Sequence, residues 1–174
     1  RPRMLVDVSH NEISTTVLEQ NINLPIMLAP TGNHTKAHKD GELATVRAAG
    51  NIGTIMILSI NAGYLMEEVA KAATGPIWFQ HYMFKDRELT LSMVQKAENL
   101  GYSALCMTLD TRGVRPKRER NLRNKYSSTP SPNLPDSIMK ERSRLALEGS
   151  SLYDYSYGDP SATWPYLEWL ASKT

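Results

Sequence analysis

The fold is decided by the stretch Ile77-Trp-Phe-Gln-His-Tyr82, an apolar run that closes on polar residues. Three further runs share this pattern: Leu24-Pro-Ile-Met-Leu-Ala-Pro-Thr-Gly32, Thr54-Ile-Met-Ile-Leu-Ser59 and Ala104-Leu-Cys-Met-Thr-Leu-Asp-Thr111. Near-continuous apolar runs are typical of strands that are buried on both faces, and hence of a parallel sheet. Buried strands that recur regularly and carry polar residues at their C-terminal ends are how a βα barrel presents an active site. The four runs therefore predict an α/β barrel architecture.

Amphipathic helical patterns separate these runs. The pattern over Asp40–Gly50 begins at an N-cap residue and ends at glycine, Leu65–Ala73 repeats it, and Asp86–Gly101 gives the clearest helix. Right-handed crossovers through such helices are the usual connections between parallel strands. Ahead of the first run, Met4–Val8 and Thr15–Leu18 are predicted to pair as a short antiparallel hairpin.

The character of the chain changes after Thr111. Residues 112–160 contain five of the ten prolines, with a helical pattern over Asp136–Leu147 between them. Long connections in compact domains are usually functional or disordered, so we expect this loop, the fourth βα connection, to form a lid or insertion over the catalytic face. A last helix is predicted over Thr163–Ser172. We expect residues 1–174 to form a single partial barrel domain.

Composition limits the class of protein. The chain has 174 residues, of which 41% are hydrophobic and 22% charged, which is enough for one core. A net charge of +2 gives no overall field that would attract nucleic acid. No apolar stretch is long enough to span a membrane and Arg1-Pro-Arg3 begins no signal peptide, so we expect a soluble chain. Its compartment stays open, with the cytoplasm, the peroxisome and the mitochondrion as the intracellular alternatives. The single cysteine, Cys106, excludes a disulfide framework and is predicted to be a buried, inert thiol.

Strand alternation groups the polar residues by face. Gln80 and Tyr82 share one face of their run while His81 points away, and the same parity puts Thr108 and Asp110 together. If these faces look toward the barrel axis, an amide, a phenol, a hydroxyl and a carboxylate converge near its mouth. Such a set can hydrogen-bond a polar heterocycle and a small acid together. The alternative is that these side chains only cap strand ends and satisfy loop backbone, and their repetition on four runs favours the functional interpretation.

Two other patterns carry weaker signals. Residues 112–125 include seven cations against one acid, Glu119, and could bind phosphate or nucleic acid. Because no stacking aromatic residues are interleaved, we favour a solvated loop with one functional arginine and predict no nucleic-acid partner. His34 and His38 are four residues apart but are not predicted to share a helix, so we expect no metal site.

A series of collinear motifs runs from Arg1 to Asn124 and returns near Trp164. The series includes Leu24-Pro-Ile-Met-Leu-Ala-Pro-Thr31, Phe79-Gln-x-Tyr82, Thr108-Leu-Asp-Thr111 and Arg118-Glu-Arg-Asn-Leu-Arg-Asn124. Together these motifs resemble the FMN-dependent 2-hydroxy-acid oxidase and dehydrogenase family, to which glycolate oxidase, lactate oxidase and lactate monooxygenase belong. Members fold as (βα)8 TIM barrels. The resemblance therefore implies the N-terminal half of such a barrel, with the first four βα units preceded by a short β-hairpin.

The resemblance implies FMN as the cofactor and assigns two groups of residues to it. The turn that lies beside the flavin ring near its reactive nitrogen is matched by Pro30, Thr31 and Gly32. The residues that hydrogen-bond the pyrimidine edge of the ring are matched by Ser59, Gln80 and Thr108. Hydroxyl and amide groups suit this edge because it offers both donors and acceptors.

The resemblance also implies roles toward the substrate, a small 2-hydroxy acid. Tyr82 matches a tyrosine that bonds the substrate and steadies developing charge. Asp110 matches the carboxylate that orients and stabilises the protonated catalytic histidine. Arg118 matches an arginine near the substrate carboxylate, where a planar bidentate donor is the natural partner. The segment after the fourth run is one residue longer than in the family, so Arg115 competes with Arg118 for this role.

The chain departs from the family pattern at two single positions and over the segment Gly32-Asn-His-Thr35. Family members usually carry a tryptophan two residues after the position of Ser59, where this chain has Asn61, and more often have alanine where Gly32 stands. These changes are compatible with a divergent member of the family or with relaxed selection.

In the family, the catalytic histidine, the principal carboxylate-binding arginine, a lysine beside the flavin and the phosphate site lie in strands five to eight, which this chain lacks. We therefore expect part of an FMN-dependent oxidoreductase that oxidises a small L-2-hydroxy acid to the 2-oxo acid, inactive as this chain alone. The alternative is a divergent, non-catalytic half-barrel that acts as a structural or interaction subunit. Since an open half-barrel exposes strand edges and interior apolar surface, both hypotheses predict a C-terminal half-barrel polypeptide as partner, or self-association.

Overall fold

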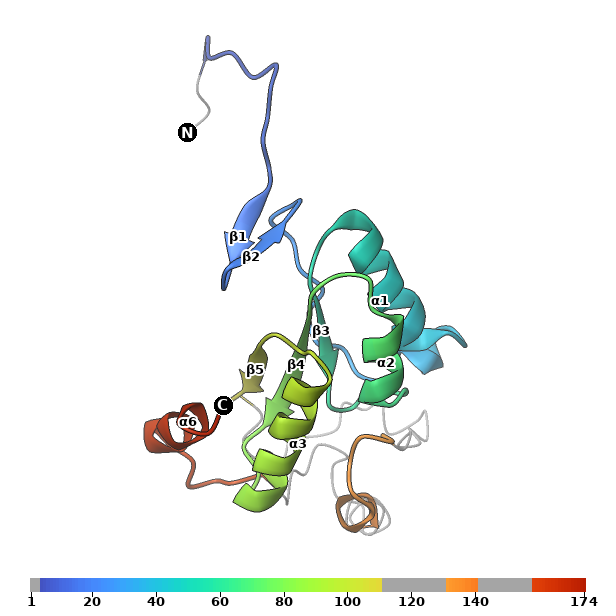
Figure 1. The fold of residues 1–174 in the computed structure, drawn as a ribbon, viewed down its shortest axis with the longest axis vertical. Coiled ribbons are helices and arrows are strands. Elements are labelled where there is room, and N and C mark those ends of the chain that lie inside the picture. The colour runs from blue at the N-terminus through green and yellow to red at the C-terminus, as the bar shows by residue number, and fades with distance from the viewer. Residues whose placement is uncertain (1–3, 111–130, 141–157) are drawn as a thin grey trace, which may run out of the picture.

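Three parallel strands form the centre of the fold in the computed structural model, which describes residues 4–110, 131–140 and 158–174 (Figure 1). They are β3 (Met56–Ser59), β4 (Ile77–Tyr82) and β5 (Leu105–Thr108), and they lie side by side in chain order. β3 pairs with β4 and β4 with β5, both in parallel. The parallel sheet that the apolar runs predict is therefore confirmed.

The first predicted run, residues 24–32, pairs with β3 through one isolated β-bridge and forms no strand. Leu28 forms an isolated parallel bridge to Met56, in which the Leu28 N–H donates to Ile55 O and the Ile57 N–H donates to Leu28 O, both at 3.0 Å. Pro25 and Pro30 flank this bridge, and proline has no N–H to donate to a ladder. The run still occupies the place next to β3, but as a bridge and not as a strand.

The helices follow the predicted pattern closely. They are α1 (Gly41–Ile52), α2 (Met66–Ala72) and α3 (Arg87–Asn99), preceded by the 3-10 turn η1 (His34–Lys36). The Asp86 side chain caps α3 by accepting from the Leu89 N–H at 2.9 Å, and Gly53 ends α1 with a φ of 70°. α1, α2 and α3 all supply residues to one core cluster on the outer face of the sheet.

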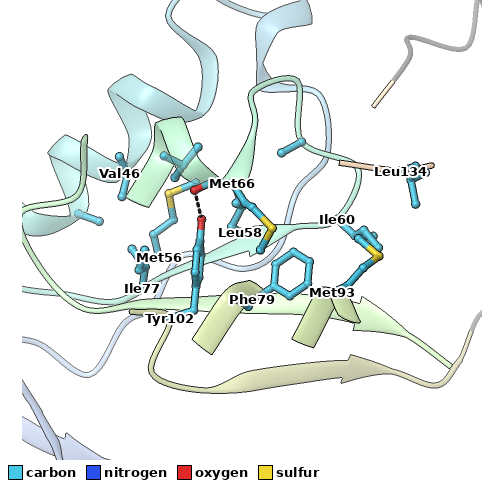
Figure 2. Packing of buried hydrophobic residues seen from close by; sticks show 14 of the residues in the cluster. Val46, Met56, Leu58, Ile60, Met66, Ile77, Phe79, Met93, Tyr102 and Leu134 are labelled. Carbon is cyan, nitrogen blue, oxygen red and sulfur yellow. Dashed lines mark hydrogen bonds between the residues drawn. The ribbon is translucent and has the colours of Figure 1, made fainter. Parts of the chain in front are cut away.

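Two apolar layers lie on opposite faces of the sheet. The outer layer packs alternate strand residues such as Leu58 and Phe79 against the three helices, and the Tyr102 hydroxyl donates to Met66 O at 2.9 Å inside it (Figure 2). The inner layer holds Ile57 and Trp78, among others. A sheet covered on both faces needs apolar residues at successive positions, which explains why the runs read as continuous.

The predicted hairpin exists, but its position is wrong. β1 (Thr15–Val17) pairs antiparallel with β2 (Gln20–Ile22), and Met4–Val8 forms no strand. The two connecting residues, Leu18 and Glu19, have φ angles of 46° and 63°. Positive φ at both central residues is the requirement of a tight two-residue hairpin turn. Because this turn joins Thr15–Val17 directly to Gln20–Ile22, the strand pairs with the segment that follows it and not with Met4–Val8. The hairpin lies at the N-terminal ends of the strands, where Ile22 packs into the inner layer (Figure 1).

The helix α6 (Trp164–Ala171) confirms the prediction over Thr163–Ser172 and docks on α3. Thr90 and the Tyr166 hydroxyl lie 2.9 Å apart, and the Arg87 guanidinium stacks 4.9 Å from the centroid of the Trp169 ring. Residues 136–140 are helical, in agreement with the start of the helix predicted over Asp136–Leu147, whose remainder lies outside the described residues. Within the described ranges, no helix has the length and apolar character required to cross a membrane.

Candidate functional site

A row of hydrogen-bonded polar side chains crosses the three strands on the inner face. The Ser59 hydroxyl donates to Gln80 Oε1 at 3.1 Å, and Gln80 Nε2 donates to Thr108 Oγ1 at 2.9 Å. We call Ser59, Gln80 and Thr108 the polar row. The parallel register explains it, because Ser59 pairs with Gln80 and Tyr82 pairs with Thr108. Alternation then brings all three side chains to one face near the C-terminal strand ends.

Gln80 is the fixed centre of this row. It is 2% exposed. Its Oε1 also accepts from the Ile60 N–H at 3.3 Å, and its Nε2 also donates to His81 O at 3.2 Å. The amide thus uses two acceptor and two donor positions, which is its full capacity. This network sets the orientation of the amide and, through it, of both hydroxyls.

The two predicted catalytic residues lie beyond the row. Tyr82 is half-buried, pairs with Thr108 in the register of β4 and β5, and packs against the core cluster that contains Phe79. Asp110 is exposed and follows the last residue of β5 by two positions. Arg118 and its competitor Arg115 lie outside the described residues. The register thus brings the backbone of Tyr82 next to Thr108 of the row. The roles of Tyr82, Asp110 and Arg118 toward the substrate stay predictions.

The predicted flavin turn is fixed against the end of β3. The Asn33 N–H donates to Asn61 O at 3.1 Å, which holds Pro30, Thr31 and Gly32 beside the loop that follows Ser59. A Cβ at position 32 would lie 3.0 Å from the Asn61 Cβ and 3.1 Å from its carbonyl oxygen. The two single positions that depart from the family pattern are therefore in contact with each other.

One buried charged residue was not anticipated from the sequence. Glu42 is fully buried, and its Oε1 accepts from the His34 N–H at 3.0 Å and from the Gly63 N–H at 2.9 Å. An acidic residue in the first turn of a helix is ordinarily solvent-exposed, so the helical pattern alone gives no signal of this role. We return to Glu42 below.

His81 and Cys106 illustrate the two faces of the sheet. His81 packs between Phe79 and Phe84 on the outer face, as strand alternation predicts, and burial lowers its pKa from 6.5 to about 4. Cys106 lies on the inner face and is partly buried, not fully buried as expected, and burial raises the pKa of its thiol. Within the described parts of the chain, no group of three or more His, Cys, Asp or Glu residues could hold a metal ion.

A separate cavity of about 520 Å³ lies beside the turn, lined by residues between Thr31 and Thr45. It includes Thr31 and Gly32 but no member of the polar row. The row and this cavity are therefore distinct features.

The donor set of the polar row determines what it can bind. A hydroxyl has one donor and two acceptor positions, so Ser59 and Thr108 keep hydrogen-bonding capacity beyond their bonds to the saturated amide of Gln80, which holds them in one line. A flat heterocycle whose edge alternates carbonyl and N–H groups matches such a line, and the pyrimidine edge of a flavin has this character. The row therefore fits the flavin that the motifs imply.

Comparisons with known proteins agree with this geometry. The family model of FMN-dependent dehydrogenases matches residues 1–174. The chain is 39% identical over 176 residues to a peroxisomal (S)-2-hydroxy-acid oxidase of Oryza sativa subsp. japonica, covering 100% of this chain and 48% of that protein. It is 42% identical over 180 residues to an L-lactate oxidase of Nostoc sp., covering 99% of this chain and 49% of that protein.

Solved structures show the same relation. A soluble mutant of the membrane-associated (S)-mandelate dehydrogenase of Pseudomonas putida superposes with a TM-score of 0.81 at 30% identity, covering 100% of this chain and 49% of that one. A mandelate oxidase mutant with bound (S)-mandelic acid superposes with a TM-score of 0.76 at 26% identity, covering 100% of this chain and 46% of that one. The chain thus spans about half the length of the proteins that it resembles.

Proposed function

Since the chain belongs to the FMN-dependent dehydrogenase family, we propose that it forms one wall of the FMN site in an enzyme that oxidises a small L-2-hydroxy acid to the 2-oxo acid. The observation that carries this proposal is the polar row, in which Gln80 is buried and fully hydrogen-bonded between two hydroxyls. When bound, FMN accepts the two electrons that are removed from the hydroxy acid. The described residues would bind and orient it.

The cofactor contacts divide into two groups. In the polar row, the amide of Gln80 is already fully hydrogen-bonded and fixes its two neighbours. Ser59 and Thr108 therefore make the direct bonds to the pyrimidine edge of the flavin, and Gln80 holds their hydroxyls in line. The turn of Pro30, Thr31 and Gly32 lies beside the ring, and glycine at position 32, where the family more often has alanine, does not block the approach of the cofactor.

Three residues act toward the substrate in this proposal. Tyr82 donates a hydrogen bond to the substrate oxygen and stabilises the charge that develops there. Asp110 orients the base that removes the substrate proton and stabilises its protonated form. Arg118 binds the substrate carboxylate. The base itself comes from the part of the relatives that this chain does not span.

The half-length match makes the rest of the barrel part of the proposal. We propose that residues 1–174 supply one partial barrel of four βα units, with residues 112–160 as an insertion, and that a C-terminal half-barrel polypeptide completes it. The chain alone is then inactive. A second candidate, a structural half-barrel without catalysis, is favoured by one observation, the paired departures at Gly32 and Asn61.

The test is the mass and flavin absorbance of the purified assembly that contains this chain. We expect bound FMN whose visible absorbance bleaches when glycolate or lactate is added without oxygen. The variant Gln80→Leu should retain much less FMN. Thr90→Val is the matched control, because it removes a buried hydrogen bond to Tyr166 away from the row. A colourless assembly without a second-half polypeptide would exclude the enzyme and leave the structural subunit.

A further inference from the structure

We propose that Glu42 is a positioning residue whose carboxylate ties together two loops that border the proposed FMN site. This inference rests on the proposed function for its consequence at the cofactor, but the tie itself is defined by contacts of this chain. The first loop follows the Leu28 bridge and includes η1. The second loop follows β3 and leads into α2.

One oxygen of Glu42 joins the two loops. Its Oε1 accepts from the His34 N–H of the first loop at 3.0 Å and from the Gly63 N–H of the second at 2.9 Å. Both amides thus converge on a single atom. Hydrogen bonds to an ionised acceptor are roughly twice as strong as neutral ones, so this atom is an effective anchor for two backbone segments.

The burial of Glu42 indicates that the carboxylate serves more than packing. The residue is fully buried, and its Oε2 has no hydrogen-bond partner among the described residues. Burying a carboxylate is unfavourable unless its interactions offset the lost hydration. Glu42 is the second residue of α1, where the helix dipole favours negative charge, and this offsets part of the penalty.

The loops approach more closely than side chains would allow. A Cβ at Gly63 would lie 2.4 Å from Thr35 Oγ1 and 2.8 Å from Thr35 Cγ2. Glycine at this position therefore lets the second loop reach the first, and Glu42 fixes the approach. The same pair of loops makes the Asn33 N–H to Asn61 O bond.

The tie continues into the polar row. The Asn61 N–H donates to Ser59 Oγ at 3.2 Å, and Ser59 in turn donates to Gln80. Loss of the Glu42 anchor would thus free the backbone on which both the flavin turn and the first member of the row depend. Displacements of about 1 Å at such positions are enough to impair a binding site.

The second loop has an independent anchor on its other side. The Ser131 hydroxyl donates to Ile60 O at 2.7 Å, and Asn133 Nδ2 donates to Tyr64 O at 2.8 Å. These bonds do not involve Glu42. We therefore expect a Glu42 variant to keep the fold while loosening the contact between the two loops.

The experiment measures amide hydrogen exchange at His34 and Gly63 in the purified assembly, together with its affinity for FMN. Glu42→Leu should accelerate exchange at both amides by about tenfold or more, and should weaken FMN binding by a similar factor. Glu42→Gln should lie between the wild type and Glu42→Leu in both, because an amide oxygen still accepts two hydrogen bonds but lacks the charge that strengthens them. Thr90→Val, the matched control, should change neither quantity.

Gly63→Ala provides a second route to the same result, since it separates the loops without altering the carboxylate. Unchanged protection of both amides in Glu42→Leu and Gly63→Ala would overturn the tie. Faster exchange with unchanged FMN affinity and an unchanged flavin spectrum would overturn the positioning role. If the wild-type assembly binds no FMN, the proposed function fails, and the exchange data still decide whether Glu42 ties the loops.

Discussion

The buried His81 should make the stability of this protein fall with acidity. Its ring is fully buried between Phe79 and Phe84, with centroid distances of 5.8 and 4.6 Å. Nδ1 donates to Tyr82 O, and Nε2 has no hydrogen-bond partner among the described residues. Protonation of the ring would place the second proton on Nε2, where no acceptor in the described structure could bind it. Burial therefore lowers the pKa of His81 from 6.5 to about 4, despite the opposing effect of the bond to Tyr82.

The sign and size of the effect follow from proton linkage. Between pH 6.5 and 4 the unfolded state binds a proton on His81 and the folded state does not. The stabilisation is therefore complete above pH 6.5 and is lost as the pH falls toward 4. At about 1.4 kcal/mol per unit of pKa difference, the loss between pH 7 and pH 5 is about 2 kcal/mol, and it approaches about 3 kcal/mol below pH 4.

The assay is urea unfolding of the purified assembly, followed by tryptophan fluorescence at several pH values, for the wild type and for His81→Leu. Leucine fills the site with an apolar side chain and removes the titratable imidazole. The difference in unfolding free energy between the two proteins should be constant above pH 7 and should change by about 2 kcal/mol in favour of the variant at pH 5. Parallel pH profiles would refute the reasoning, because they would mean that His81 is solvated or already protonated in the folded protein.

Three other perturbations test contacts around the site and the core. Asn133→Ala removes the acceptor of the Met66 N–H and the donor to Tyr64 O. It should lower the free energy of unfolding by about 2–4 kcal/mol in urea titrations. A loss under about 1 kcal/mol would show that other groups or water replace these bonds. Tyr102→Phe removes only the hydroxyl bond to Met66 O and should lower it by about 1 kcal/mol in the same titrations, so a larger loss would point to repacking. Since burial raises the pKa of Cys106, its alkylation by iodoacetamide at pH 8 should be at least about tenfold slower in the folded protein than in urea, and equal rates would contradict its burial.

The sequence predicted the sheet well because its signals are local. β4 spans Ile77–Tyr82, the same bounds as the apolar run, and the helices end within two residues of the predicted positions. The hairpin was misplaced because its turn residues, Leu18 and Glu19, are not the glycine or asparagine that such turns usually carry. The first run was overestimated because its apolar character outweighed the two prolines that interrupt pairing.

The polar row could be anticipated in part. Strand parity placed Gln80 and Tyr82 on one face, but the bonds from Gln80 to Ser59 and Thr108 depend on the register between strands, which periodicity does not give. Glu42 could not be anticipated at all, because its burial results from two loops that fold over the start of α1. Contacts between loops far apart in the chain carry no local pattern.

The energetics of the buried polar groups bear on the choice between an enzyme wall and a structural subunit. A half-barrel that served only as a scaffold would be as stable, or more stable, with apolar residues of similar size in place of Gln80 and Glu42, since buried polar and charged groups gain little net stability. Instead, Gln80 is 2% exposed and uses every donor and acceptor that it has. Relaxed selection would be expected to erode such a network first, because each member is needed to satisfy the others. The intact row therefore favours the hypothesis that the chain forms part of the FMN site of an enzyme. The departures at Gly32 and Asn61 lie in contact, and we interpret them as one coupled change of shape beside a retained site.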